Sequence, residues 1–207
     1  KRNAVLLAHE IELANVCLAL RSAVATAGYG LIDEPELKAM LPASTVQKLD
    51  KPLRLQATAY PNNFPHLAEL LKEPIELVSE PDRLLLIVRP DRAGWAFAVE
   101  LDMGSEDLNA KILRGKATWA RKVVSYHSAW MHGTHLAQWG EWCRSFRCIT
   151  ITPNETRLKN MIDIQQHITR GVAGLFAYTT PERIKAHGIL GPAWANAKCS
   201  NFSLIEA

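Results

Sequence analysis

The chain has no long apolar run, no paired cysteines and no large excess of one charge. No stretch approaches the ~18 consecutive apolar residues of a membrane-spanning helix, and the first residues lack the pattern of a signal peptide. The four cysteines form no CxxC pair and show no disulfide-dense spacing, which favours a reducing cytoplasm. A formal net charge of +3 permits an anionic partner without requiring one. We therefore expect a cytoplasmic protein with neither a membrane span nor a disulfide framework.

The sequence also lacks a phosphate-cradling glycine loop and a sequence context for a serine or cysteine nucleophile. Its 207 residues are 48% apolar and 22% charged, which is enough to bury a core. The length suits one domain spanning residues 1–207. Six prolines between residues 35 and 80 break that region into short pieces, so we expect an irregular insertion there.

The remaining pattern alternates between helices and strands. Apolar spacing predicts a helix over residues 8–26, on Ile11, Ala14, Val16, Leu18, Leu20 and Val24. We expect strands near residues 29–32, 53–59, 83–89, 95–102, 147–152 and 175–179, and helices near 66–72, from 104 to 130, from 154 to 168, and from 181. A hairpin followed by strand–helix crossovers predicts an α/β fold with a mixed central sheet flanked by helices.

Residues 81–102 carry the most informative pattern, two apolar strands joined by a turn with acids at their outer ends. Asp82 opens the first strand, and Glu100 and Asp102 close the second. In a hairpin these ends lie side by side, and residues two apart point to the same face. Convergent carboxylates suit Mg²⁺ or Mn²⁺. The pattern therefore indicates a metal-dependent phosphodiester-cleaving site or the remains of one.

The dipeptide Pro-Asp occurs twice in this region. Pro90-Asp91 lies between the two strands, beside Gly94, where proline, aspartate and glycine are usual turn residues. A proline inside a strand would remove a ladder donor, so the second Pro-Asp belongs to the turn. Asp82 is therefore the candidate ligand, and Asp91 is the turn residue.

Several motifs in this order resemble the C-terminal region of the replication-relaxation family of plasmid and integrative-element proteins. They are HEIELANVCLAL, the Pro-Asp strand, VELDMGSEDL, ITITPNETRLKNM, LFAYTTPERI and GILGPAWA. The resemblance implies a restriction-endonuclease-like (PD-(D/E)xK) core, in which a helix precedes a hairpin and a helix–strand unit follows. Members of the family typically carry a winged helix before this domain, so an upstream domain is expected.

The resemblance also implies roles for particular residues. In a PD-(D/E)xK site, Asp82 and Glu100 would hold the metal, and a lysine two residues after the central acid assists the attacking water. Asp102 stands at that lysine position and could serve only as a further ligand. The lysine could come from the following helix, as Lys116 or Lys111. Glu106 or Glu10 could add an oxygen ligand.

The same helix carries basic residues interleaved with an aromatic one. Lysine and arginine neutralise phosphates and an aromatic side chain can stack on a base. The candidate DNA-binding residues are Lys111, Arg114, Lys116, Arg121 and Lys122, with Trp119 among them. The alternative is that Trp119 belongs to the core and the charges form a solvated face.

Two functions follow from these patterns. The first is a DNA-acting enzyme of a mobile genetic element that cleaves phosphodiesters with a divalent metal. The second is a non-catalytic domain that retains the nuclease fold and binds DNA or partner proteins in plasmid replication, conjugative transfer or transcription control. The missing strand lysine favours the second, and three retained acids favour the first, since an unpaired carboxylate inside an apolar strand is costly.

Overall fold

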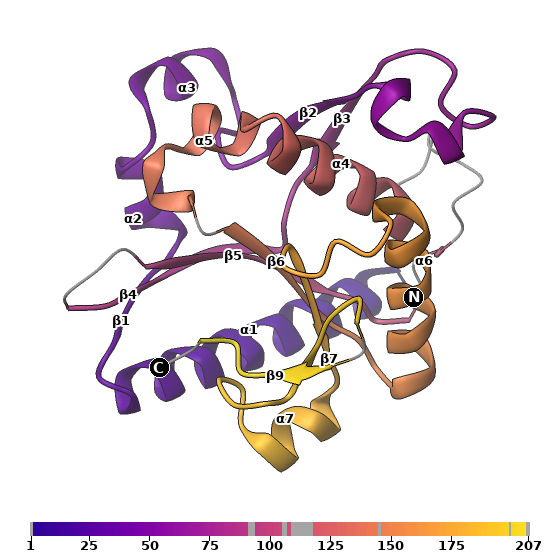
Figure 1. Cartoon of the computed structure of the whole chain (residues 1–207). Coiled ribbons are helices and arrows are strands. Elements are labelled where there is room, and N and C mark those ends of the chain that lie inside the picture. Colours follow the sequence, from indigo (N-terminus) through magenta and orange to yellow (C-terminus); the bar gives the residue numbers. More distant parts are fainter. Residues whose placement is uncertain are drawn as a thin grey trace.

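The structure is a computed structural model that describes residues 2–90, 94–104, 107–108, 118–144, 146–198 and 200–205. Within these ranges seven strands form one sheet, in the order β1-β4-β5-β6-β7-β8-β9 (Figure 1). They are β1 (Gly30–Ile32), β4 (Arg83–Val88), β5 (Trp95–Leu101), β6 (Phe146–Ile151), β7 (Phe176–Thr179), β8 (Trp194–Ala195) and β9 (Asn201–Phe202).

The sheet is mixed. β4 pairs antiparallel with both β1 and β5, while β5, β6 and β7 run parallel. Each parallel step is bridged by a helix, because parallel strands need a long crossover. β8 and β9 extend the sheet antiparallel. The expected mixed α/β sheet flanked by helices is confirmed.

Helices cover both faces of this sheet (Figure 1). They are α1 (Arg2–Thr26), α2 (Glu34–Ala39), α3 (Ala43–Lys48), α4 (Trp119–Met131), α5 (Thr134–Trp139), α6 (Glu155–Thr169) and α7 (Pro181–His187). Short 3-10 turns occur at Pro61–Asn63, Pro65–Leu67 and Glu141–Cys143. Within the described residues no helix is both long and apolar enough to span a bilayer.

The alternation of β5 divides the core in two. Ala96 and Ala98 face the cluster formed with α4 and α6, whereas Phe97, Val99 and Leu101 face the cluster formed with α1. Glu100 continues the Ala96–Ala98 side, because residues two apart share a face. The central acid is therefore directed towards α4.

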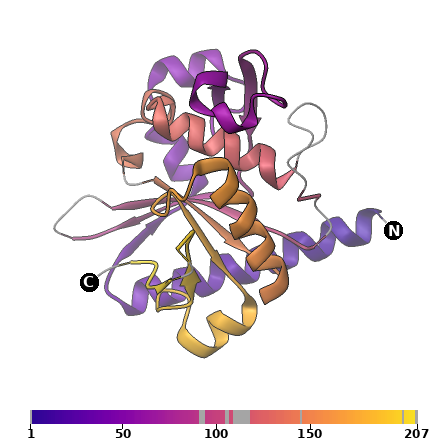
Figure 2. The ribbon, with the colours of Figure 1, turned by 45° about the vertical axis from the view of Figure 1, so that its right-hand side comes forward.

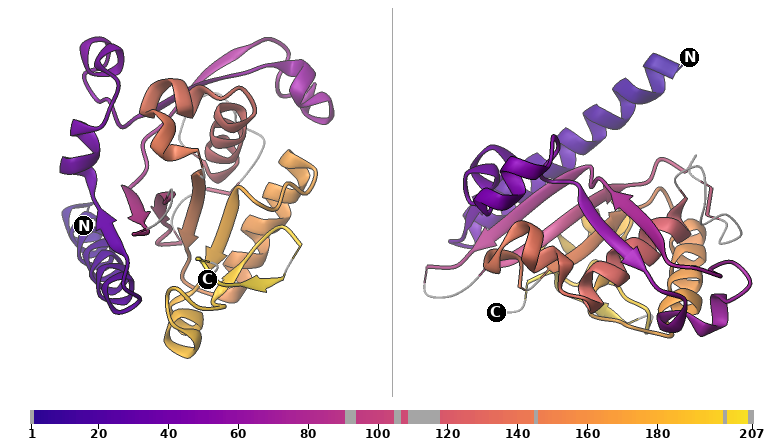
Figure 3. Two further views of the ribbon diagram at one scale, coloured as in Figure 1. Left: turned by 60° about the vertical axis from the view of Figure 1, so that its left-hand side comes forward. Right: turned by 90° about the horizontal axis from the view of Figure 1, so that it is seen from above.

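α1 packs on the other face through Leu13, Val16, Leu20 and Val24, at helical spacing. Of the residues that predicted the helix, Ile11 and Leu18 are instead 54% and 67% exposed. The N-terminal turns of α1 extend past the end of the sheet (Figures 2 and 3). The N-terminal part of α1 is thus largely exposed at this end of the sheet.

The irregular region contains a second, two-stranded sheet of β2 (Leu55–Ala59) and β3 (Ile75–Ser79), whose strands pair antiparallel. The buried side of this sheet packs on α4. The strand at 53–59 was predicted, and β3 was not. The helix predicted at 66–72 is wrong, because only the 3-10 turn Pro65–Leu67 forms there.

The long helix predicted from residue 104 is also wrong at its start. Thr118 has an extended backbone and its hydroxyl accepts a hydrogen bond from the Arg121 amide, so α4 begins at Trp119. Asp107 and Leu108 are not helical. The expected starts of α6 and α7 are confirmed: Asn154 caps α6, and Pro181 is the first residue of α7.

Candidate functional site

Asp82 and Glu100 meet at one end of the β4–β5 hairpin. The pairing of Arg83 with Val99 brings Asp82 beside the end of β5, where the Leu101 amide donates to Asp82 Oδ2 at 2.8 Å. This contact fixes the carboxylate of Asp82 by the strand that carries Glu100. The side chain of Asp82 remains 24% exposed.

Glu100 is buried, with 2% of its surface exposed. Two side chains of α4 reach it: Lys122 Nζ donates to Oε2 at 2.9 Å, and Tyr126 Oη donates to Oε1 at 2.5 Å. Residues four apart lie on one face of a helix, so the first two turns of α4 present both groups to the same carboxylate. A buried charge without such partners would be costly.

Burial is the main reason that the pKa of Glu100 is raised, and the negative charge of Asp82 adds to it. The ammonium of Lys122 acts in the opposite direction. Burial and the neighbouring Glu100 also hold the pKa of Tyr126 well above its usual value, so this phenol stays protonated and donates. The electrostatics of this site thus combine two neighbouring carboxylates, one of them buried, with the ammonium of Lys122.

His9 of α1 completes the surroundings of Asp82. Its Nε2 lies 3.4 Å from Asp82 Oδ2, whereas Glu10 is 60% exposed and accepts from Arg83 Nη2 at 3.3 Å. His9 and Asp82 line a pocket of about 350 Å³ at the end of β5, together with Val5, Leu6, Leu101, Asp102, Met103 and Lys122. Asp82, His9 and Lys122 therefore line one shared space, which we call the carboxylate pocket.

Asp102 has a different set of partners from the other two acids. Arg157 of α6 binds both of its oxygens, with Nε at 2.7 Å from Oδ2 and Nη2 at 3.0 Å from Oδ1. Thr152 Oγ1 and the Gly104 amide each donate at 3.0 Å. Four donors on a carboxylate that is 5% exposed leave it engaged in joining β5, β6 and α6.

The other candidate residues divide between described and undescribed parts of the chain. Arg121 and Lys122 lie in the first turn of α4. Trp119 is fully buried, and its indole nitrogen donates to the Met161 carbonyl, so it belongs to the core. The remaining candidates, Glu106, Lys111, Arg114 and Lys116, lie outside the described residues, as does the turn residue Asp91.

Three residues of this site were not assigned these roles from the sequence. Lys122 was a candidate for DNA contact, and neither His9 nor Tyr126 was singled out. The spacing of Lys122 and Tyr126 at i and i+4 was the available signal for a polar face directed at the sheet. For His9 the signal was its position next to Glu10, one helical turn before the buried Leu13.

The donors of this site are chemically suited to a divalent cation, with oxygen from Asp82 and Glu100 and nitrogen from His9. The repulsion between the two carboxylates is the feature that a cation would relieve. Against this, both oxygens of Glu100 already accept hydrogen bonds. Among the described residues, no three His, Cys, Asp or Glu side chains are grouped closely enough to enclose an ion.

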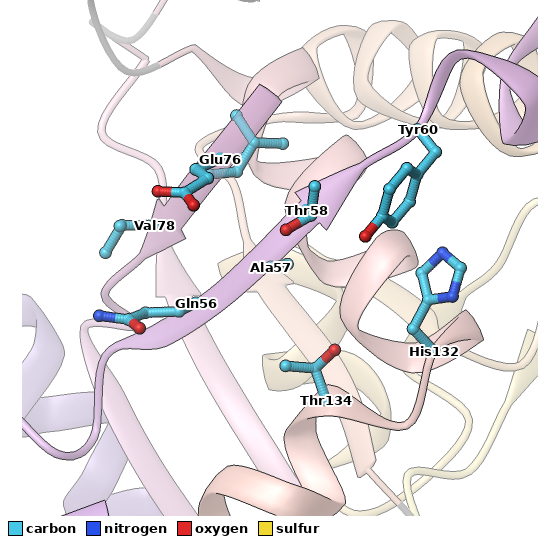
Figure 4. A pocket seen from close by; sticks show the side chains of 9 residues that line it. Gln56, Ala57, Thr58, Tyr60, Glu76, Val78, His132 and Thr134 are labelled. Atoms are coloured by element: carbon cyan, nitrogen blue, oxygen red, sulfur yellow. The ribbon is translucent and has the colours of Figure 1, made fainter. Parts of the chain in front are cut away.

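A separate hollow of about 430 Å³ lies over β2 and β3 and the turn between α4 and α5 (Figure 4). It shares no lining residue with the carboxylate pocket. The Tyr60 and His132 rings meet edge to face at 5.3 Å, and His132 also bonds the Asn63 amide. The side chains around it are mostly neutral and polar, with Glu76 as the charged member.

Comparison of the chain with protein families, with curated proteins and with solved structures finds no match.

Proposed function

We propose that this chain has a restriction-endonuclease-like core and acts on the DNA of a mobile genetic element by divalent-metal-dependent phosphodiester cleavage. In chain order, α1 and β1 come before the antiparallel β4–β5 hairpin, with the β2–β3 region inserted between them, and α4, α5 and β6 follow it; this order supports the core. The resemblance of the sequence to the replication-relaxation family supports the genetic context.

The observation that carries the proposal is the contact between Lys122 Nζ and Glu100 Oε2 at 2.9 Å. The PD-(D/E)xK reaction needs a cation next to the central acid, and Asp102 occupies the strand position that usually supplies it. Lys122 approaches the same acid from α4. In the proposal this lysine of α4 takes the role that the sequence analysis assigned to Lys116 or Lys111.

In this proposal Asp82 and Glu100 would hold Mg²⁺ or Mn²⁺, and His9 lies beside Asp82. The ion would lower the pKa of a water and screen the scissile phosphate. Lys122 offsets the charge that develops on the phosphate and orients the attacking water. Tyr126, which stays protonated, holds the second oxygen of Glu100 in place. Arg121 lies in the same helical turn and is a candidate contact for a neighbouring phosphate.

A non-catalytic nuclease-fold domain that binds DNA or partner proteins is the second candidate. One observation favours it: the Glu100 carboxylate has internal donors on both oxygens and needs no ion to be stable. Lys122 would then be the structural counter-ion of a buried acid, and the carboxylate pocket would serve recognition alone.

Calorimetric titration with Mn²⁺ and nicking of supercoiled plasmid test the proposal together. Asp82→Asn and Glu100→Gln are expected to weaken Mn²⁺ binding and to slow nicking by at least a hundredfold each, because each removes a charged ligand. Asp163→Asn, an exposed acid on α6, is the matched control and is expected to match the parent protein.

Lys122→Met is expected to slow nicking while leaving Mn²⁺ affinity nearly unchanged, since lysine is not a ligand. Circular dichroism establishes that each variant is folded. A folded parent protein that binds no Mn²⁺ at millimolar concentration with DNA present would overturn the catalytic proposal. Retained DNA binding in that experiment would favour the non-catalytic domain.

A further inference from the structure

An apolar hollow of about 460 Å³ lies beside the carboxylate pocket, between α1, the ends of β5 and β6 and the start of α7. Its size lies in the range of about 300–1,000 Å³ that is common for small-molecule sites. Most of its lining is apolar: Ala8, Ile11, Leu101, Met103, Ile151, Pro153 and Pro181. Ile11 and Met103 are 54% and 40% exposed, so the apolar wall is open to solvent.

The polar groups of this hollow disfavour a phosphate. None of its described lining residues is lysine or arginine. Glu12 contributes a carboxylate, and the remaining polar side chains, Asp102 and Thr152, are hydrogen-bonded to each other. The hollow therefore suits a neutral group with apolar faces, and Glu12 provides an acceptor for an N–H at its edge.

The hollow and the carboxylate pocket are neighbours that share the walls Leu101, Asp102 and Met103. α1 lines both of them: His9 faces the carboxylate pocket, and Ile11 and Glu12 face the apolar hollow. A group that is covalently attached to a phosphate in the first space can thus reach the second. In a nucleic acid, the neutral group with apolar faces next to a phosphate is the base.

We propose that the apolar hollow takes one unpaired nucleobase adjacent to the phosphate in the carboxylate pocket, so that the substrate is single-stranded or branched DNA. This inference rests on the proposed function. In an intact duplex each base is stacked and paired, and extruding one costs a few kcal/mol. A base that is already unpaired enters without that cost and gains contact with the apolar wall.

The test measures binding alone, in EDTA, so that no metal or cleavage is needed. Fluorescence anisotropy compares a labelled single strand with the matching duplex, and then a set of single strands with one abasic position moved along the sequence. We expect the single strand to bind about tenfold more tightly, and one abasic position to reduce its affinity about tenfold.

Ile11→Gln and Leu18→Gln form a matched pair of variants. Both residues are exposed on α1 and both changes are neutral in charge, but only Ile11 lines the hollow. Ile11→Gln is expected to lose most of the preference for single strands and to become insensitive at the critical abasic position. Leu18→Gln is expected to behave as the parent protein, which excludes a general effect on the helix.

Equal affinity for single strand and duplex, or an abasic profile that Ile11→Gln leaves unchanged, overturns the inference. If the natural occupant of the hollow is instead an apolar side chain of a partner protein, Ile11→Gln would leave the abasic profile unchanged. If one abasic position lowers the affinity but Mn²⁺ produces no nicking, the base site is supported and the proposed cleavage is rejected. The failure of this inference and the failure of the proposed function are therefore distinguishable.

Discussion

Asp102 and Glu100 lie two residues apart in the sequence, but different kinds of cationic side chain bind them. Glu100 is held by the flexible ammonium of Lys122 and by a phenol, next to another acid. Asp102 is held by the planar guanidinium of Arg157 through both oxygens. A bidentate arginine is a geometrically specific and strong partner, whereas a lysine can be displaced or reoriented more readily. We therefore expect the partners of Glu100 to be exchangeable, whereas Asp102 makes a fixed structural contact.

Asp102→Asn is expected to lower the free energy of unfolding by about 3 kcal/mol, because it removes the buried negative charge that binds Arg157 through both oxygens. Urea denaturation measures this loss, and calorimetry is expected to give an unchanged Mn²⁺ affinity. Glu155→Gln breaks the more exposed pair with Arg183 and should cost less than about 1 kcal/mol. A stable Asp102→Asn protein with lost Mn²⁺ affinity would return Asp102 to the metal site.

The β4–β5 hairpin is the element that brings Asp82 and Glu100 together. The register of the hairpin depends on the close approach of the Gly94 backbone to β4 just before β5 begins. A Cβ added at Gly94 would lie 2.0 Å from the carbonyl oxygen of Ile87. Ile87 pairs with Trp95, so this backbone cannot move without disturbing the ladder. A slip of one residue would turn Glu100 from α4 towards α1.

Gly94→Ala is expected to destabilise the protein by about 2 kcal/mol or more, since the added methyl group collides with backbone and not with a movable side chain. Gly174→Ala is the matched change, because nothing lies within 4 Å of a Cβ there, and we expect it to be tolerated. Thermal unfolding of the two variants measures the difference. Equal unfolding temperatures would show that the hairpin turn adjusts without cost.

At the scale of the whole molecule, stability depends on ionisable groups that folding removes from water. His127 of α4 is 6% exposed and lies against the rings of Phe64 and Trp130. Its burial lowers its pKa from 6.5 to about 4. The unfolded chain therefore binds a proton at this histidine between pH 6.5 and 4, and the folded protein does not.

Proton binding by the unfolded state alone means that stability falls as the pH drops through this window. We expect His127 to account for a loss of about 3 kcal/mol between pH 6.5 and 4. Chemical denaturation at a series of pH values should give a flatter profile for His127→Phe than for the parent protein. His187→Gln, an exposed histidine of α7, should retain the parent profile. Identical profiles for all three proteins would contradict the role of His127.

Local signals predicted the central elements well. The strands at 83–88 and 95–101, the Asn154 cap and the start of α7 at Pro181 all follow from neighbouring residues. β3 was missed because its alternation is short and its partner β2 lies about twenty residues earlier. The start of α4 was misplaced because the cap at Thr118 competes with an equally plausible glycine–serine start at residue 104.

The sequence by itself determined that Asp82 and Glu100 close one end of a hairpin, because turn chemistry and strand alternation act between near neighbours. Only the tertiary structure determined which basic side chain contacts which acidic one. Lys122 reaches Glu100, Arg157 reaches Asp102 and His9 reaches Asp82 because α4, α6 and α1 pack on the sheet in particular orientations. Those orientations are set by two apolar cores whose contacts join residues far apart in the chain, and no local pattern encodes them.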